Sequence, residues 1–211
     1  MKKYFLIIPF LLLLIQGCKK DEPAAPITPP VNPPPVAALP LAIGNYWIYE
    51  CVRIDTNGTE TITYPEDSVY ISKDSLINGE TYYELRGMNW IPCLSCVEYV
   101  RDSAGFIVTC HGEKLFAPVY DNYLFSFDSI SNYSGTYHYM TSGNTLVNVP
   151  AGMFITAVVT QVTYFHPNYN WDNPRYNNIY YCDGIGVVKE EQYYDASPDM
   201  NVGRLLRYHV E

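Results

Sequence analysis

Short runs of alternating apolar and polar residues, rich in Tyr, Val, Ile and Thr, fill most of the chain from residue 41 to residue 211. Alternation with a period of two is typical of strands that bury one face, and the 3.6-residue repeat of amphipathic helices is not visible. Turn residues separate the runs at short intervals. The segment therefore predicts a single all-β domain, an antiparallel meander that curls into an open barrel or a sandwich.

Three pairs of runs predict β-hairpins. Asn57-Gly58 suits a two-residue type I′ loop, in which both residues have positive φ, and such a loop would pair Ile54 with Thr61. Gly79 is the expected left-handed residue of a second hairpin, and residues 102–105 form the turn of a third. Further strands are expected at 121–127, 133–140, 145–149, 154–166, 177–182, 186–195 and 203–210. The long run 154–165 is expected to bend or twist strongly.

Residues 1–17 predict a cleaved signal peptide. Lys2 and Lys3 precede an apolar run from Tyr4 to Ile15, which is shorter than the roughly 20 residues that a membrane-spanning helix needs. The residues Ile-Gln-Gly-Cys at 15–18 resemble the lipobox of bacterial lipoproteins. This resemblance implies cleavage before Cys18, lipid attachment to Cys18 and anchoring of the protein in a membrane.

A proline-rich segment extends from Cys18 to residue 40. Proline fixes φ and lacks an amide donor, so residues 18–40 are expected to form an extended, disordered tether. The order Cys-Lys-Lys-Asp-Glu at 18–22 also resembles the export signals of surface lipoproteins in Bacteroidetes-type bacteria. The predicted location is the bacterial cell envelope, with the protein lipid-anchored at the outer membrane, on its periplasmic face or on the cell surface.

The chain is acidic, with a formal net charge of −9. It has no basic run that would attract a phosphate backbone, so nucleic acid is not an expected partner. The expected partners are the membrane, through the lipid on Cys18, and a glycan or protein of the envelope.

Several segments of the β domain resemble uncharacterised lipoproteins of Bacteroidetes-type genomes, among them LPLAIGNYWIYE, DSVYISKDSLINGETYYEL, VPAGMF and YYCDGIGVVKEE followed by RLLRYHVE. The last pieces also resemble periplasmic half-barrel proteins related to LolA and LolB. These resemblances imply a curved antiparallel sheet with a concave apolar face and no particular reaction. We interpret GIGVVK as the entry into a strand, in which Val188 faces the core while Lys189 and Glu191 face water.

Five cysteines follow the lipidation site: Cys51, Cys93, Cys96, Cys110 and Cys182. An oxidising envelope favours disulfides. A turn at 102–105 would place residues 96–97 opposite residues 110–111 and so bring Cys110 within reach of Cys96 or Cys93. Cys51–Cys182 is a candidate second bridge. The alternative is a zinc site of Cys93, Cys96, Cys110 and His111, although adjacent side chains such as those of Cys110 and His111 point to opposite faces of a strand.

Common catalytic motifs are absent from the sequence, which contains neither G-x-S-x-G, S-x-x-K nor H-E-x-x-H, nor a phosphate-binding glycine loop. We therefore expect no enzymatic activity and no cofactor. The expected function is that of a non-catalytic binding or assembly module. The alternative is a carrier that holds a lipid or another hydrophobic ligand in a half-barrel.

Tyrosine is abundant, with 21 residues, and residues 164–181 combine it with Asn, Asp and two prolines. Aromatic side chains beside amide side chains are typical of sugar-binding and protein-binding surfaces. We therefore predict a binding loop whose aromatic side chains are partly exposed. Its candidate residues are Tyr164, His166, Tyr169, Trp171 and Tyr176. The alternative is a large structural loop, since Pro, Asn and Asp also form turns.

Overall fold

The computed structural model describes residues 38–87, 97–131, 134–165, 175–193 and 197–211, all within one compact unit, Pro33–Glu211. The predicted signal peptide and most of the predicted tether lie outside these ranges. The described residues form twelve strands and no helix: β1 (Tyr46–Ile54), β2 (Glu60–Ile77), β3 (Glu80–Arg86), β4 (Val97–Ser103), β5 (Phe106–Thr109), β6 (Lys114–Phe116), β7 (Tyr123–Ser131), β8 (Ser134–Val149), β9 (Gly152–Phe165), β10 (Arg175–Cys182), β11 (Gly186–Tyr193) and β12 (Met200–His209). A helix with the length and hydropathy of a membrane span is likewise not found in them.

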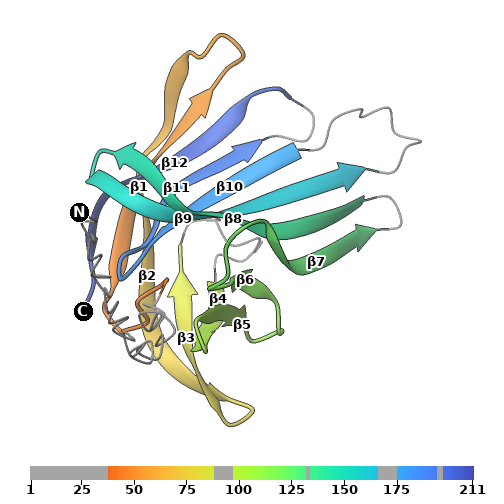
Figure 1. Ribbon diagram of the computed structural model, residues 1–211. Coiled ribbons are helices and arrows are strands. Elements are labelled where there is room, and N and C mark those ends of the chain that lie inside the picture. Colours follow the sequence, from red (N-terminus) through yellow and green to blue (C-terminus); the bar gives the residue numbers. More distant parts are fainter. Residues whose placement is uncertain (1–37, 88–96, 132–133, 166–174, 194–196) are drawn as a thin grey trace, which may run out of the picture. The chain divides into compact units, whose positions relative to one another are not determined.

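All twelve strands belong to one antiparallel sheet, in the order β6-β5-β4-β3-β2-β1-β12-β11-β10-β9-β8-β7. Each strand pairs with its neighbour in sequence except β6 and β7, while β1 pairs with β12. The sheet curls until its two edge strands, β6 and β7, come into contact without ladder pairing. The result is a nearly closed barrel (Figure 1), which confirms the predicted all-β antiparallel meander.

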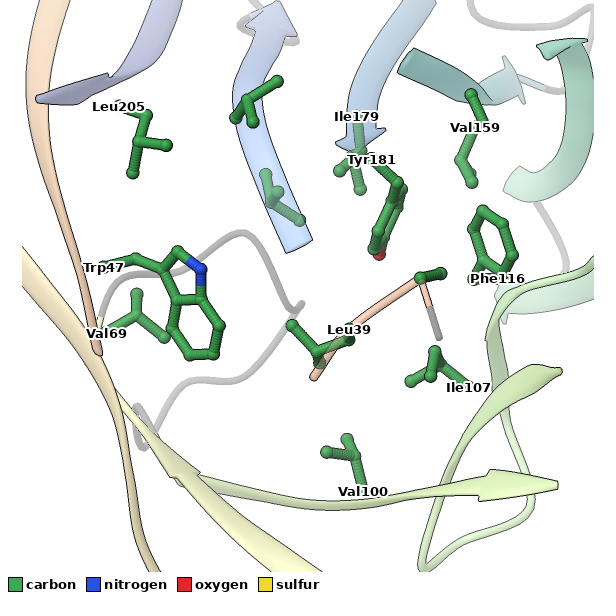
Figure 2. Close-up of a cluster of buried hydrophobic side chains, with 14 of the residues drawn as sticks. Leu39, Trp47, Val69, Val100, Ile107, Phe116, Val159, Ile179, Tyr181 and Leu205 are labelled. Atoms are coloured by element: carbon green, nitrogen blue, oxygen red, sulfur yellow. The ribbon is translucent and has the colours of Figure 1, made fainter. Parts of the chain in front are cut away.

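The interior of the barrel is filled by side chains from strands on all sides and by the segment that precedes β1. Trp47, Val159 and Leu205 are fully buried, and Leu39 is 1% exposed. Figure 2 shows Leu39 lying among the inward-pointing side chains of these strands. A buried residue of this size contributes about 1.5–3 kcal/mol. Ala38, Leu39 and Pro40, which the sequence assigned to the end of the tether (18–40), are therefore part of the core, and we call the segment 38–45 that contains them the plug.

Hydrogen bonds hold the plug in place. The buried Asn45 donates from Nδ2 to the carbonyl of Pro40 (3.0 Å) and accepts at Oδ1 from the amide of Glu211 (3.0 Å). The amide of Ile71 donates to the carbonyl of Asn45. The plug is thus tied to β2 and to the C-terminus.

The strand that contains GIGVVK has the predicted alternation, but Lys189 and Glu191 do not simply face water, because their side chains are only 25% and 16% exposed. Val188 is buried, whereas Lys189 and Glu191 form an ion pair on the other face. Gly186 has a φ of +103°, and a Cβ there would lie 3.0 Å from Leu39 and 3.3 Å from Trp47. Glycine is therefore required at this position because the plug and β1 approach the backbone closely.

Two of the predicted hairpins need comment. Asn78 and Gly79 both have positive φ and join Ile77 to Glu80, which confirms the left-handed Gly79. The predicted two-residue type I′ loop at Asn57-Gly58 was wrong. Only Gly58 has positive φ, and Ile54 pairs with Glu60 and not with Thr61.

The physical reason for the different register is the side chain of Asp55. Its Oδ1 accepts hydrogen bonds from the amides of Asn57 and Thr59 (2.8 Å each). These bonds stabilise a wider loop in which the amide of Gly58 donates to the carbonyl of Asp55 and the amide of Asp55 to that of Thr59. A type I turn followed by a left-handed glycine has this pattern.

Strands β8 and β9 form the longest hairpin of the sheet. The sequence predicted two separate strands at 133–140 and 145–149, but the structure has one, Ser134–Val149, with pairing irregularities between Met140 and Thr145. The tip of the hairpin reaches β12, where the amide of Ala151 donates to the carbonyl of Leu205 (2.9 Å). The short strand β6 was not predicted.

Candidate binding surface

Five aromatic side chains gather on the outer side of β7 to β10, which is the side opposite to the core: Phe127, Tyr137, Tyr139, Tyr164 and Tyr176. We call this set the aromatic face. Two of its members, Tyr164 and Tyr176, belong to the binding loop predicted from the sequence. The other three come from β7 and β8.

The strand register produces the aromatic face. Phe127 pairs with Tyr137, Tyr137 with Val162, and Val162 with Tyr176. Directly paired residues share a face of a sheet, so these side chains form one row across four strands. Alternation places the next residue of β8, His138, on the inner side, where it is buried.

Ring contacts hold three members, Phe127, Tyr139 and Tyr164, in fixed positions around Tyr137. The Tyr137 centroid lies 4.5 Å from that of Phe127 and 5.4 Å from that of Tyr164, which stands edge-on at 88°. Tyr139 stacks on Tyr137 at 6.4 Å and 24°. Aromatic pairs of this geometry contribute about 0.5–1.5 kcal/mol beyond their burial. The face is therefore preorganised.

The outer members remain accessible to solvent. Phe127 is 51% exposed, Tyr164 47% and Tyr176 49%. The pKa of Tyr164 is raised, first by partial burial and then by the neighbouring hydroxyls of Tyr139 and Tyr176. Tyr164 and Tyr176 are thus partly exposed, as predicted, but they lie on β9 and β10, and Tyr181 of the same predicted loop is buried in the core.

A polar network continues the aromatic face onto β11. Asn178 accepts a hydrogen bond from Thr160 Oγ1 (2.8 Å) and donates one to Glu191 Oε2 (3.1 Å). The hydroxyl of Tyr180 donates to the same oxygen (2.8 Å), and Lys189 Nζ donates to the other carboxylate oxygen of Glu191 (2.5 Å). Burial alone would raise the pKa of Glu191, but these hydrogen bonds outweigh it and lower the pKa. A fixed carboxylate and amide thus stand beside the exposed rings.

The remaining residues of the predicted loop, His166, Tyr169 and Trp171, lie outside the described residues. Sequence reasoning missed Phe127, Tyr137 and Tyr139. The alternation Tyr137-His138-Tyr139 was a visible signal, because it places two tyrosines on one face of a strand. The sequence does not show that this face adjoins Tyr164 and Tyr176.

The cysteines form a second region of interest. The amide of Cys110 donates to the carbonyl of Tyr99 (2.9 Å). Residue 110 thus lies opposite residue 99, and not opposite 96–97 as the predicted hairpin register required. Cys93 and Cys96 lie outside the described residues, so their pairing with Cys110 stays a prediction.

The suggested Cys51–Cys182 bridge is not formed. Cys51 lies on β1 and Cys182 at the end of β10, with β12 and β11 between them. Three strand spacings of about 4.8 Å exceed the Cα separation of about 7 Å that a disulfide tolerates. The prediction of a Cys51–Cys182 bridge was therefore wrong.

Cys110 instead lies beside two other side chains that can bind metal. Its Sγ is 4.0 Å from Glu98 Oε1, and one ligand atom each of Glu98, Cys110 and His111 lies within 4.8 Å of the others. The pKa of the Cys110 thiol is raised, first by burial and then by the carboxylates of Glu98 and Glu113. Sequence reasoning named Cys110 and His111 as alternative ligands but missed Glu98.

No protein-family profile matches the sequence, and no curated protein matches it either. Two crystal structures are similar in fold. One, from Parabacteroides distasonis, is described as a candidate lipoprotein. Its sequence is 13% identical, the match covers 82% of this chain and 99% of the other, and the TM-score is 0.48. The second, from Bacteroides fragilis, is described as a candidate exported protein with a YmcC-like fold; the identity is 14%, the coverage 82% and 99%, and the TM-score 0.43. At these values the similarity carries no argument about function.

Proposed function

We propose that the protein is a lipid-anchored lipoprotein of the bacterial envelope whose β domain binds a glycan through the aromatic face, without catalysing a reaction. The anchor would be the lipid on Cys18, at the outer membrane, and residues 19–37 would serve as the tether. The observation that carries the binding part is the exposure of the Phe127, Tyr164 and Tyr176 rings on one side of the sheet, with Phe127 and Tyr164 held against Tyr137.

The chemistry of the surface favours a glycan. The C–H faces of a sugar ring are apolar and pack on aromatic rings, while its hydroxyls need donors and acceptors nearby. Asn178 and Glu191 supply such groups within the hydrogen-bonded network that adjoins Tyr176. Because these side chains lie on strands, they change little on binding, which lowers the entropic cost of association.

A carrier of hydrophobic ligands is less well supported. Such a protein needs an open apolar cavity of several hundred Å³. The described residues fill the inner side of the sheet with large side chains, including Trp47, Tyr49 and Tyr181, and Leu39 of the plug packs among them (Figure 2). The outer side therefore offers the better binding surface.

The experiment is a binding screen of the mature protein against immobilised envelope polysaccharides and peptidoglycan. We expect Tyr176→Ala to weaken binding of the selected glycan at least about tenfold, because truncation of aromatic hot spots often costs more than about 2 kcal/mol. Tyr176→Phe keeps the ring and should retain most of the affinity.

The matched control is Tyr70→Ala, since Tyr70 is 41% exposed and lies on β2, away from the aromatic face. Both alanine variants should melt close to the wild type, because surface substitutions usually change stability by no more than about 0.5 kcal/mol. Glycan binding that survives Tyr176→Ala and Tyr164→Ala together would overturn the proposal, as would selective capture of a protein in place of any glycan.

A further inference from the structure

The turn that follows β5 places two metal-binding side chains on a rigid support. The amide of Gly112 donates to the carbonyl of Thr109 (3.0 Å), and the amide of Thr109 donates to the carbonyl of Glu113 (2.8 Å). The buried Thr109 also accepts at Oγ1 from the amides of His111 (3.3 Å) and Glu113 (3.2 Å). Cys110 and His111 are therefore central residues of a closed turn.

This turn removes the objection that a Cys-His dipeptide is a poor ligand pair. The objection holds for a strand, in which neighbouring side chains point to opposite faces. Strand β5 ends at Thr109, and the chain turns through Gly112, which has a φ of +87°. Both side chains thus come within reach of Glu98 on β4.

The carboxylate of Glu98 is held in position near the thiol of Cys110 by a backbone hydrogen bond. Its Oε1 accepts a hydrogen bond from the amide of Tyr99 (3.0 Å), which fixes the carboxylate, and the same oxygen lies 4.0 Å from Cys110 Sγ. Glu98 pairs with the core residue Leu85, so it faces the inner side of the sheet near the turn. A carboxylate from β4 and a thiol and an imidazole from the turn after β5 consequently converge.

We propose that Glu98, Cys110 and His111 bind Zn²⁺. Sulfur, nitrogen and oxygen ligands in this combination suit zinc, which accepts Cys, His and carboxylate ligands in one tetrahedral site. Ligand atoms around a tetrahedral zinc stand roughly 3.3–3.8 Å apart, so the observed separations, which are at most 4.8 Å, must contract by no more than about 1–1.5 Å. His111 is exposed and free to turn towards the ion. The fourth position would be taken by water.

The site lies on β4 and on the turn after β5, whereas the aromatic face lies on β7 to β10. It does not depend on the proposed glycan binding. It competes with the predicted disulfide, because Cys110 cannot be a zinc ligand and half of a cystine at the same time. Cys93 and Cys96 form no part of the proposed site.

The test is equilibrium dialysis of the mature protein against Zn²⁺, followed by elemental analysis and by competition with a chromophoric chelator. We expect one zinc per chain, and a loss of affinity of at least about tenfold in each of Glu98→Gln, Cys110→Ser and His111→Ala. Replacement by Co²⁺ should give a sulfur-to-cobalt charge-transfer absorption that Cys110→Ser abolishes.

Cys182→Ser is the matched control, because Cys182 is another partly buried thiol, at the end of β10. It should bind zinc like the wild type. Cys110→Asp replaces the thiolate by a carboxylate ligand and should bind zinc more tightly than Cys110→Ser. This result would show that Cys110→Ser loses affinity because a ligand is missing and not because the protein misfolds. Zinc binding unaffected by Cys110→Ser, no binding at all, or a cystine at Cys110 in non-reducing peptide maps of the envelope protein would each overturn the proposal.

Discussion

The raised pKa of Glu190 gives a direct test of which side chains of β11 point to the inner side of the sheet. Glu190 pairs with the buried Ile179, so its carboxyl points to the inner side, whereas its neighbour Glu191 points to the outer polar network. Tyr49 and Tyr181 lie near enough for the charge of Glu190 to raise the pKa of each hydroxyl further, beyond the larger effect of burial. Among the described residues, no hydrogen bond or ion pair to its carboxyl is found. Burial raises the pKa of Glu190 from 4.5 to about 8.

The sign of the pH dependence follows from this direction. Between about pH 4.5 and about pH 8 the folded protein holds a proton on Glu190 that the unfolded chain has released. The free energy of unfolding therefore falls as the pH rises through this window. Each pKa unit is worth about 1.36 kcal/mol, which gives about 5 kcal/mol for the whole shift. Because Glu190 keeps some solvent contact, we expect a loss of about 2–4 kcal/mol.

Urea denaturation of the wild type and of Glu190→Gln between about pH 5 and about pH 9 measures this loss. The wild type should lose stability relative to the variant as the pH rises, because the neutral amide does not ionise. Glu191→Gln is the matched control: the pKa of Glu191 is lowered, so its contribution is lost only in acid, below the pH range of the experiment. Parallel curves for wild type and Glu190→Gln would refute the inward placement of a protonated Glu190. An infrared band of the protonated carboxyl, absent from Glu190→Gln, gives an independent readout.

Two further predictions concern single residues. Gly87→Ala should destabilise the domain by about 2 kcal/mol or more, because Gly87 has a φ of +117° and a Cβ there would collide with the Ser68 carbonyl. Gly79→Ala, at a positive φ with open space around it, should cost only about 1–2 kcal/mol in chemical denaturation, and equal losses for both would contradict the packing argument. Labelled palmitate should enter the wild-type protein and not Cys18→Ala, and labelling that survives the substitution would show that the lipobox resemblance misleads.

Much of the fold could be predicted because most strands show their inner and outer positions in the order of their own residues. The alternation in β1, with Trp47 and Tyr49 inside, is one example, and the opposite orientations of Glu190 and Glu191 are another. The residues of a turn did not by themselves determine the length of the loop. Asn57-Gly58 fits both a two-residue and a wider loop, and Asp55 decides between them through hydrogen bonds that form only in the folded hairpin.

The candidate sites were harder to predict, because both depend on residues brought together by register. Tyr137 and Phe127 join Tyr164 only when β7, β8 and β9 lie side by side, and strand order is not encoded locally in a sequence. Glu98 is twelve residues from Cys110 and reaches it only through the exact length of the β4–β5 hairpin. Ser103 pairs with Phe106 across a two-residue loop, in which Ala104 and Gly105 have positive φ. A longer loop would shift Glu98 away from the thiol.

The inner face of β8 to β10 packs in the core, whereas the outer face carries the exposed aromatic side chains. On the inner side, Met140, Val159 and Ile179 are almost fully buried and account for the attachment of these strands to the core. Aromatic side chains on the outer side are not needed for that purpose, and smaller polar residues there would leave the inner packing unchanged. Large exposed rings on the surface of a soluble domain mark interaction sites when they are contiguous. Because the ring contacts around Tyr137 order these side chains without a ligand, we propose that a partner packs against the aromatic face across the four neighbouring strands.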